Sequence, residues 1–171
     1  MPKIIDHDAR RNELATRAAT LFSKHGYAGL GMRKIAEELG ISKSALYHYF
    51  PSKKALFHAC TDMVMRYDAP LGKAALPLDA LFDILKAQAP GFAAELSLVL
   101  DYTRGQSPEE IAADPTMQLA NARYADLVRA AVPTQDVNPV VCLLLGALMM
   151  RHFDGGQTDL DEIRDWLIAK S

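Results

Sequence analysis

Apolar residues recur along most of the chain at intervals of three and four positions, the spacing of one buried face of an α-helix. Four such patterns follow one another in the first 66 residues. Gly26 and Gly40 suit the left-handed conformation that ends many helices, and Pro51 interrupts the third pattern. No strand-like alternation of apolar and polar residues lies between the patterns. The four predicted helices cover about 8–25, 32–39, 42–50 and 52–68.

The helical spacing resumes after residues 70–77, a segment that the sequence predicts to be a connection. Pro90-Gly91 interrupts the spacing, and the pattern leaves open whether the helix is kinked or broken there. Ser107-Pro108-Glu109-Glu110 combines a capping box with proline at the first helical position. The further helices are expected over about 78–89, 92–103, a short stretch opened by Ser107, 114–132, 138–153, and a last segment from 158 or 159. The predicted fold class is all-α, with about nine helices.

The composition is that of an ordinary globular protein. Half of the 171 residues are apolar and 23% are charged. Apolar runs such as 140–150 are much shorter than the roughly 20 residues of a membrane span, and the first residues do not read as a secretory signal. We therefore expect a cytoplasmic protein with no membrane contact. Cys60 and Cys142 lie in no Cys-x-x-Cys motif, so we expect two core thiols, no metal site and no cofactor.

Charge is distributed unevenly along the chain. Residues 1–66 carry eleven Lys/Arg and six Asp/Glu, a net charge of +5, whereas residues 67–171 carry eight and fifteen, a net charge of −7. A basic N-terminal part next to an acidic remainder suggests that only the N-terminal part faces a polyanion. Skew of this size also occurs in proteins that bind no nucleic acid, so it does not decide the function.

The segment 32–50 has the pattern of a helix-turn-helix. Gly40 supplies a tight turn between two short helices, and the small Ala36 lets them approach. The residues that fill the space between the helices are Ile35, Leu39, Ile41 and Leu46. The second helix then projects Lys43, Ser44 and Tyr47 outward, where a recognition helix meets base edges and phosphates in a major groove.

The stretch from about Ala9 to Ala59 resembles the DNA-binding head of the TetR family of bacterial transcription regulators. The matching motifs are Ala18-x-x-Leu21-Phe22, Gly26-Tyr27, Ile35-Ala36, Leu39-Gly40-Ile41-Ser42 and Leu46-Tyr47-His48-Tyr49-Phe50-x-Ser52-Lys53. They cover roughly the first third of the chain. The sequence departs from the family at Gly31, where a Ser or Thr commonly caps the second helix, so we expect a less firmly fixed start of that helix.

The resemblance implies which residues contact DNA. Arg33, Lys43 and Ser44 would face base edges, while Tyr47 and Lys53 would contact phosphates and His48 lies close enough to help. The residues expected at the DNA-binding site are Arg33, Ser42, Lys43, Ser44, Tyr47, His48 and Lys53. The expected partner is a double-stranded DNA operator.

The resemblance also implies two domains, a DNA-binding head over 1–55 and a regulatory and dimerisation body over 69–171, linked by the fourth helix to about 68. Because a short recognition helix reads few base pairs, we expect a homodimer that reads two half-sites. The helix over 138–153 and the final helix around Trp166 are both candidates for the dimer interface, and the first could instead be internal core.

A small-molecule effector is expected to bind in the body. The candidate lining residues mix apolar walls with polar groups, although side chains of these types are more often plain core. They are Phe92, Tyr102, Met117, Tyr124, Met149 and His152.

No catalytic residues are expected, because the chain has no phosphate-binding glycine loop, no Gly-x-Ser-x-Gly and no His-Glu-x-x-His, and its five histidines are scattered. The sequence thus predicts a repressor that a small molecule releases from DNA. The alternative is a DNA-binding protein of the same fold whose body binds a protein or no ligand. Whether the regulator represses or activates depends on promoter position, which the sequence leaves open.

Overall fold

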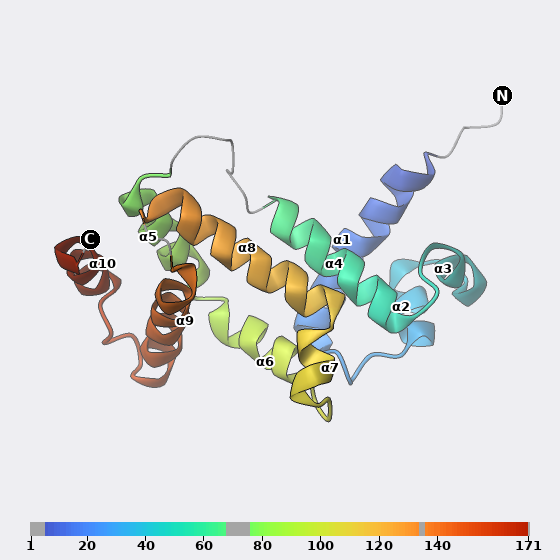
Figure 1. The fold of residues 1–171 in the computed structure, drawn as a ribbon. Coiled ribbons are helices and arrows are strands. Elements are labelled where there is room, and N and C mark those ends of the chain that lie inside the picture. Colours follow the sequence, from blue (N-terminus) through green and yellow to red (C-terminus); the bar gives the residue numbers. More distant parts are fainter. Residues whose placement is uncertain (1–5, 68–75, 134–135, 171) are drawn as a thin grey trace. The chain divides into compact units, whose positions relative to one another are not determined.

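The computed structural model describes residues 6–67, 76–133 and 136–170, and every regular element in these ranges is an α-helix (Figure 1). The helices are α1 (His7–His25), α2 (Met32–Leu39), α3 (Lys43–Tyr49), α4 (Lys53–Tyr67), α5 (Leu78–Gln88), α6 (Phe92–Tyr102), α7 (Pro108–Ala112), α8 (Pro115–Ala131), α9 (Val137–Phe153) and α10 (Leu160–Lys170). The all-α prediction is confirmed. The described ranges hold ten helices instead of about nine, because Pro90-Gly91 breaks the chain between α5 and α6.

The chain divides into two compact units. The first unit contains residues 1–69 and 97–120, and the second contains 70–96 and 121–171. The first unit therefore includes the whole of the predicted head, together with the end of α6, α7 and the start of α8. The head and body boundaries expected from the sequence stay a prediction.

Local signals in the sequence fix the helix ends of the first unit. The Asp6 side chain accepts hydrogen bonds from the backbone N–H groups of Asp8 and Ala9 and so caps α1. Gly40 has φ of 70°, in the left-handed region, and its N–H donates to the carbonyls of Ala36 and Glu37 at the end of α2. Ser42 caps α3 by accepting from the backbone N–H of Ala45.

The core of the first unit joins the helix-turn-helix to the helices behind it. α1 packs on α4, and α2 packs on α1 and α3. The large side chains that are almost wholly buried there are Leu14, Phe22, Ile35, Leu46, Phe50 and Leu56. Phe50, at the end of α3, is thus an anchor of the recognition helix. Cys60 is also buried, as expected, and burial raises the pKa of its thiol to about 12.

A polar cluster lies inside the first unit at the start of α8. Asp114 is 1% exposed and accepts hydrogen bonds from the backbone N–H groups of Thr116 and Met117 and from the hydroxyl of Tyr102. The ammonium of Lys54, on α4, lies 2.7 Å from its carboxylate. Burial raises the pKa of Asp114, but these donors outweigh it and hold the pKa at about 2. The carboxylate therefore stays charged and ties α4, the end of α6 and the start of α8 together.

The second unit has its own apolar core. α5 packs on α10, and the Lys86 ammonium on α5 lies 2.7 Å from the Asp161 carboxylate on α10. The most buried side chains of this core include Leu81, Phe82, Val128, Leu148 and Leu160. The prediction of a second core thiol is wrong, because Cys142 is exposed on α9.

The Asp114 cluster generates a prediction about acid stability. The carboxyl has a pKa of about 2 in the fold against 3.8 for the free group, so its contribution is complete above about pH 4 and is lost as the pH falls toward 2. The shift corresponds to about 2 kcal/mol of unfolding free energy. Asp114→Asn should be less stable at pH 7 and lose less stability between pH 5 and pH 2 in urea titrations. Asp126→Asn, which alters an exposed carboxylate beside Arg129, is the control and should behave as the wild type.

Candidate nucleic-acid interface

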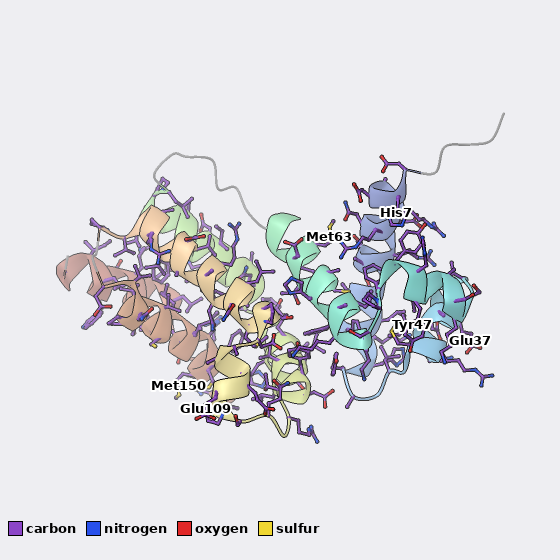
Figure 2. All side chains as sticks on the ribbon, turned by 45° about the vertical axis from the view of Figure 1, so that its right-hand side comes forward. His7, Glu37, Tyr47, Met63, Glu109 and Met150 are labelled. Carbon is purple, nitrogen blue, oxygen red and sulfur yellow. The ribbon has the colours of Figure 1, made fainter. Side chains whose placement is uncertain are left out.

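α2 and α3 form the helix-turn-helix that the sequence predicts. Ile35, Ala36 and Leu39 of α2 and Leu46 of α3 are buried, so the apolar faces of the two helices are used in packing. α3 is seven residues long and follows the left-handed turn at Gly40 after only Ile41 and the cap Ser42. Figure 2 labels Glu37 on α2 and Tyr47 on α3. The remaining face of α3 is free to contact a ligand.

This free face carries four of the predicted DNA-binding side chains. Lys43, Ser44, Tyr47 and His48 are all exposed, and Tyr47 has 41% of its surface accessible. The Lys43 ammonium lies 5.7 Å from the centroid of the Tyr47 ring, a cation–π distance that keeps the two side chains on one side of α3. Ser42 is exposed too, but its Oγ is occupied as the cap of α3 and lies 3.0 Å from Ser44 Oγ.

The two cationic side chains of α2, Arg33 and Lys34, differ in whether an ion pair already occupies them. Lys34 lies 3.0 Å from the Glu38 carboxylate and 3.9 Å from that of Glu37, so its charge is largely balanced within its own helix. The Glu38 hydrogen bond raises the pKa of Lys34, which therefore stays charged in this pair. Arg33 is exposed and forms no ion pair with any residue that the structure describes. Arg33 and Lys43 are therefore the cations of the helix-turn-helix that are available to an anionic partner.

Lys53 occupies a different environment from the one expected of a phosphate contact. Its ammonium donates hydrogen bonds of 3.0 Å to the backbone carbonyls of both Tyr27 and Leu30. It also lies 4.2 Å from the centroid of the Tyr27 ring. Two of the three N–H groups of this ammonium are thus used inside the protein.

One contributor to this surface escaped the sequence analysis. His7, at the start of α1, places its ring 5.4 Å from that of His48 and 4.6 Å from that of Tyr49. The guanidinium of Arg11 lies 5.1 Å from the centroid of the Phe50 ring. The start of α1 therefore packs against the end of α3, a contact between residues some forty positions apart for which the sequence carries no motif.

Two comparisons of the sequence with known proteins agree with this geometry. Residues 14–60 match the family described as bacterial regulatory proteins, tetR family. The HTH-type transcriptional repressor Rv1474c of Mycobacterium tuberculosis is 29% identical over 167 residues, covering 91% of this chain and 89% of that protein. The N-terminal third of the chain therefore matches the TetR family of bacterial transcriptional regulators. The chain is thus a DNA-binding transcriptional regulator.

Two further similarities show which parts of the chain resemble other proteins. The HTH-type transcriptional regulator PksA of Bacillus subtilis is 41% identical over 56 residues, 33% of this chain and 27% of that protein. A crystal structure of a TetR transcriptional regulator from Rhodococcus sp. RHA1 superimposes with a TM-score of 0.62 at 21% identity, covering 95% of this chain and 97% of that one. The second similarity shows the shared fold.

The six residues predicted to line an effector cavity lie in different environments. Tyr102 and Met117 are buried in the core of the first unit, and Phe92 is buried in that of the second. Met149 and His152 are exposed on α9. Tyr124 borders a cavity of about 20 Å³ within the second unit, whose other lining residues are Leu81, Ile84, Leu85, Gln88, Leu127, Val128, Val141, Leu144 and Leu145. Among the six, Tyr124 lines this cavity, and Met149 lines a second, open pocket of about 460 Å³ in the same unit.

The described ranges hold no cluster of three or more side chains that could bind a metal ion. Within the same ranges, no helix has both the length and the apolar character required to cross a membrane.

Proposed function

We propose that this regulator is a repressor that binds a two-fold symmetric operator as a homodimer and leaves it when a small molecule binds. The observation that carries the proposal is the exposed face of α3, which presents Lys43, Ser44 and Tyr47 beside the unpaired Arg33. Repression is supported by the relative from Mycobacterium tuberculosis, which is named a repressor and is similar along most of its length. We assign the protein to the cytoplasm, where its DNA is found.

The DNA contacts divide into two kinds. Arg33, Lys43 and Ser44 would read base edges, because they are exposed on the helix-turn-helix and carry hydrogen-bond donors that reach guanine and adenine edges. Tyr47 and His48 would contact phosphates and fix the register of α3. Ser42 would act through the cap of α3.

Homodimer formation follows from the length of the recognition helix. α3 has seven residues and is about 10 Å long, so a single head covers only a few base pairs. Two heads that reach half-sites about 34–36 Å apart would supply the missing selectivity. The large apolar side chains exposed on α9 and α10 support a second copy of the chain as their partner: Met149, Met150 (labelled in Figure 2), Phe153, Trp166 and Ile168.

The effector site that we propose is the small cavity beside Tyr124. A cavity of about 20 Å³ holds about one water molecule, so an effector would have to displace the side chains that line it. Burial raises the pKa of Tyr124, and the Glu95 carboxylate raises it further, so the phenol stays protonated and can donate to a ligand. This phenol favours an effector with a hydrogen-bond acceptor.

Base reading is tested by Lys43→Ala. Selection of bound fragments from random duplex DNA first supplies the operator. The variant should then bind the operator with a loss of about 1–3 kcal/mol and discriminate less between the operator and single-base variants. Tyr47→Phe is the matched comparison, because the loss of a phosphate contact should weaken binding to all sequences alike. Unchanged affinity and preference in Lys43→Ala would show that Lys43 does not read bases.

The dimer interface is tested by Phe153→Glu in analytical ultracentrifugation. Placing a charge in an apolar interface is strongly unfavourable, so the variant should sediment as a monomer at micromolar concentration and lose operator affinity. Leu100→Glu is the control, since Leu100 is an exposed apolar residue outside α9 and α10. A Phe153→Glu variant that remains a dimer would place the interface elsewhere.

Effector binding is tested by thermal shifts against a panel of metabolites and drugs. A ligand present at 100 times its Kd should raise the unfolding free energy by about 2.7 kcal/mol, and Tyr124→Phe should reduce that gain. The same ligand should release the wild type from its operator. Silence across the panel would favour the alternative, a regulator whose second unit binds a protein or no ligand.

A further inference from the structure

The start of α2 lacks the restraint that other helices of the first unit have. Gly31 occupies the N-cap position and has no side chain that could accept a hydrogen bond from the helix. α2 nevertheless carries Arg33 in its first turn, and it supports α3 through packing. An unrestrained helix start would let both elements shift against DNA. Besides the burial of Leu30 and Met32, the contacts of the loop 26–31, which connects α1 to α2, can restrain this helix start.

The first contact that restrains this loop comes from Lys53 of α4. The Lys53 ammonium donates to the carbonyls of Tyr27 and Leu30, each at 3.0 Å, and so bridges the loop. Hydrogen bonds from a charged donor are stronger than neutral ones. Leu30 directly precedes the Gly31 cap, so this bridge acts next to the first turn of α2.

The second contact that restrains this loop comes from Asp101 of α6. The Asp101 carboxylate accepts a hydrogen bond of 2.6 Å from the backbone N–H of Ala28. A Cβ atom on Gly26 would lie 3.2 Å from the same carboxylate, so the chain passes close to it. The Tyr27 ring also packs against the rings of Phe57 and Tyr102.

We propose that Lys53 and Asp101 are positioning residues that fix the loop 26–31 and thereby the placement of Arg33 and α3 on DNA. The Lys53 charge is then used on backbone carbonyls and makes no essential phosphate contact. The proposal rests on the proposed DNA-binding function and adds two residues, on α4 and α6, that act through the loop. The resemblance to the TetR family instead implied that Lys53 contacts a phosphate.

Asp101 provides the sharper test, because an electrostatic role and a positioning role predict opposite changes in DNA affinity when Asp101 is replaced. Removing an anion should strengthen DNA binding if electrostatics alone matters. Loss of the Ala28 hydrogen bond should instead weaken it, and we expect Asp101→Ala to bind the selected operator about tenfold more weakly, the effect of roughly one charge-assisted hydrogen bond. Asp101→Asn keeps an acceptor oxygen and should restore most of the affinity.

Asp101 also forms an exposed ion pair with Arg104, at 3.4 Å, which the test must separate from the loop contact. Arg104→Ala breaks this pair and leaves the Ala28 hydrogen bond in place, so it should lose much less affinity than Asp101→Ala. Operator binding by Asp101→Ala that equals or exceeds that of the wild type would overturn the proposal.

Lys53→Arg separates positioning from phosphate contact. Arginine keeps the charge and is a good phosphate ligand, so a phosphate contact predicts unchanged affinity. The arginine side chain is longer than lysine and its nitrogens lie in one plane, so a guanidinium nitrogen would reach the position of the ammonium between the two carbonyls only if the loop shifted, and positioning predicts a loss of about tenfold. Lys53→Met should weaken binding with an unchanged salt dependence, whereas the loss of a phosphate contact would lower the slope by about one. Full affinity in Lys53→Arg would contradict the proposal.

Amide hydrogen exchange of the free protein tests the loop without DNA. Asp101→Ala should speed exchange at Ala28, and Lys53→Met should speed exchange in the first turn of α2, while circular dichroism reports whether the helices remain. Unchanged exchange in both variants would overturn the proposal even if the wild type binds DNA. Failure of the wild type to bind any duplex would instead count against the proposed function, and the exchange result would still decide the loop restraint.

Discussion

A seven-residue helix cannot hold its own shape in water, because the cost of starting a helix exceeds the gain from so few hydrogen bonds. α3 therefore exists only through what surrounds it. Leu46 and Phe50 are fully buried beneath it, Ser42 caps its first turn, and the left-handed Gly40 fixes its angle to α2. The surface that α3 offers to DNA is thus a consequence of the core behind it, and a change in that core would act on DNA binding without any contact to DNA.

The second constraint is electrostatic and lies deeper in the first unit. Asp114 is buried with its charge, which is tolerated because Lys54, Tyr102 and two backbone N–H groups satisfy the carboxylate. Removal of one partner would leave a buried charge incompletely paired. This makes the mutual placement of α4, the end of α6 and the start of α8 specific, since a shifted arrangement of apolar surfaces alone would cost less. The same end of α6 carries Asp101, which reaches the loop 26–31.

Local signals in the sequence were sufficient for much of the fold and of the interface. Gly40, Ser42 and the capping box at Ser107 act through neighbours a few residues away, so they could be recognised in the sequence. Cys142 could not be placed, because α9 is apolar on all sides and its spacing does not indicate which face is buried. The effector candidates were chosen by residue type, whereas cavity lining depends on packing between distant helices. The contacts of His7 and Lys53 also join distant positions, and no local pattern encodes them.

The net charge of the N-terminal part overstates the number of positive charges that are free to contact DNA. Lys34 is paired with Glu38 and Lys54 with Asp114, while Arg10 and Arg17 share Glu13. Among the described cations of the helix-turn-helix, Arg33 and Lys43 remain without an ion pair. Neutralised charges add little to the release of counterions, so affinity should depend on salt less steeply than the composition suggests. Selectivity then depends on the few free donors of the helix-turn-helix, and therefore on how accurately the core holds α2 and α3 in place.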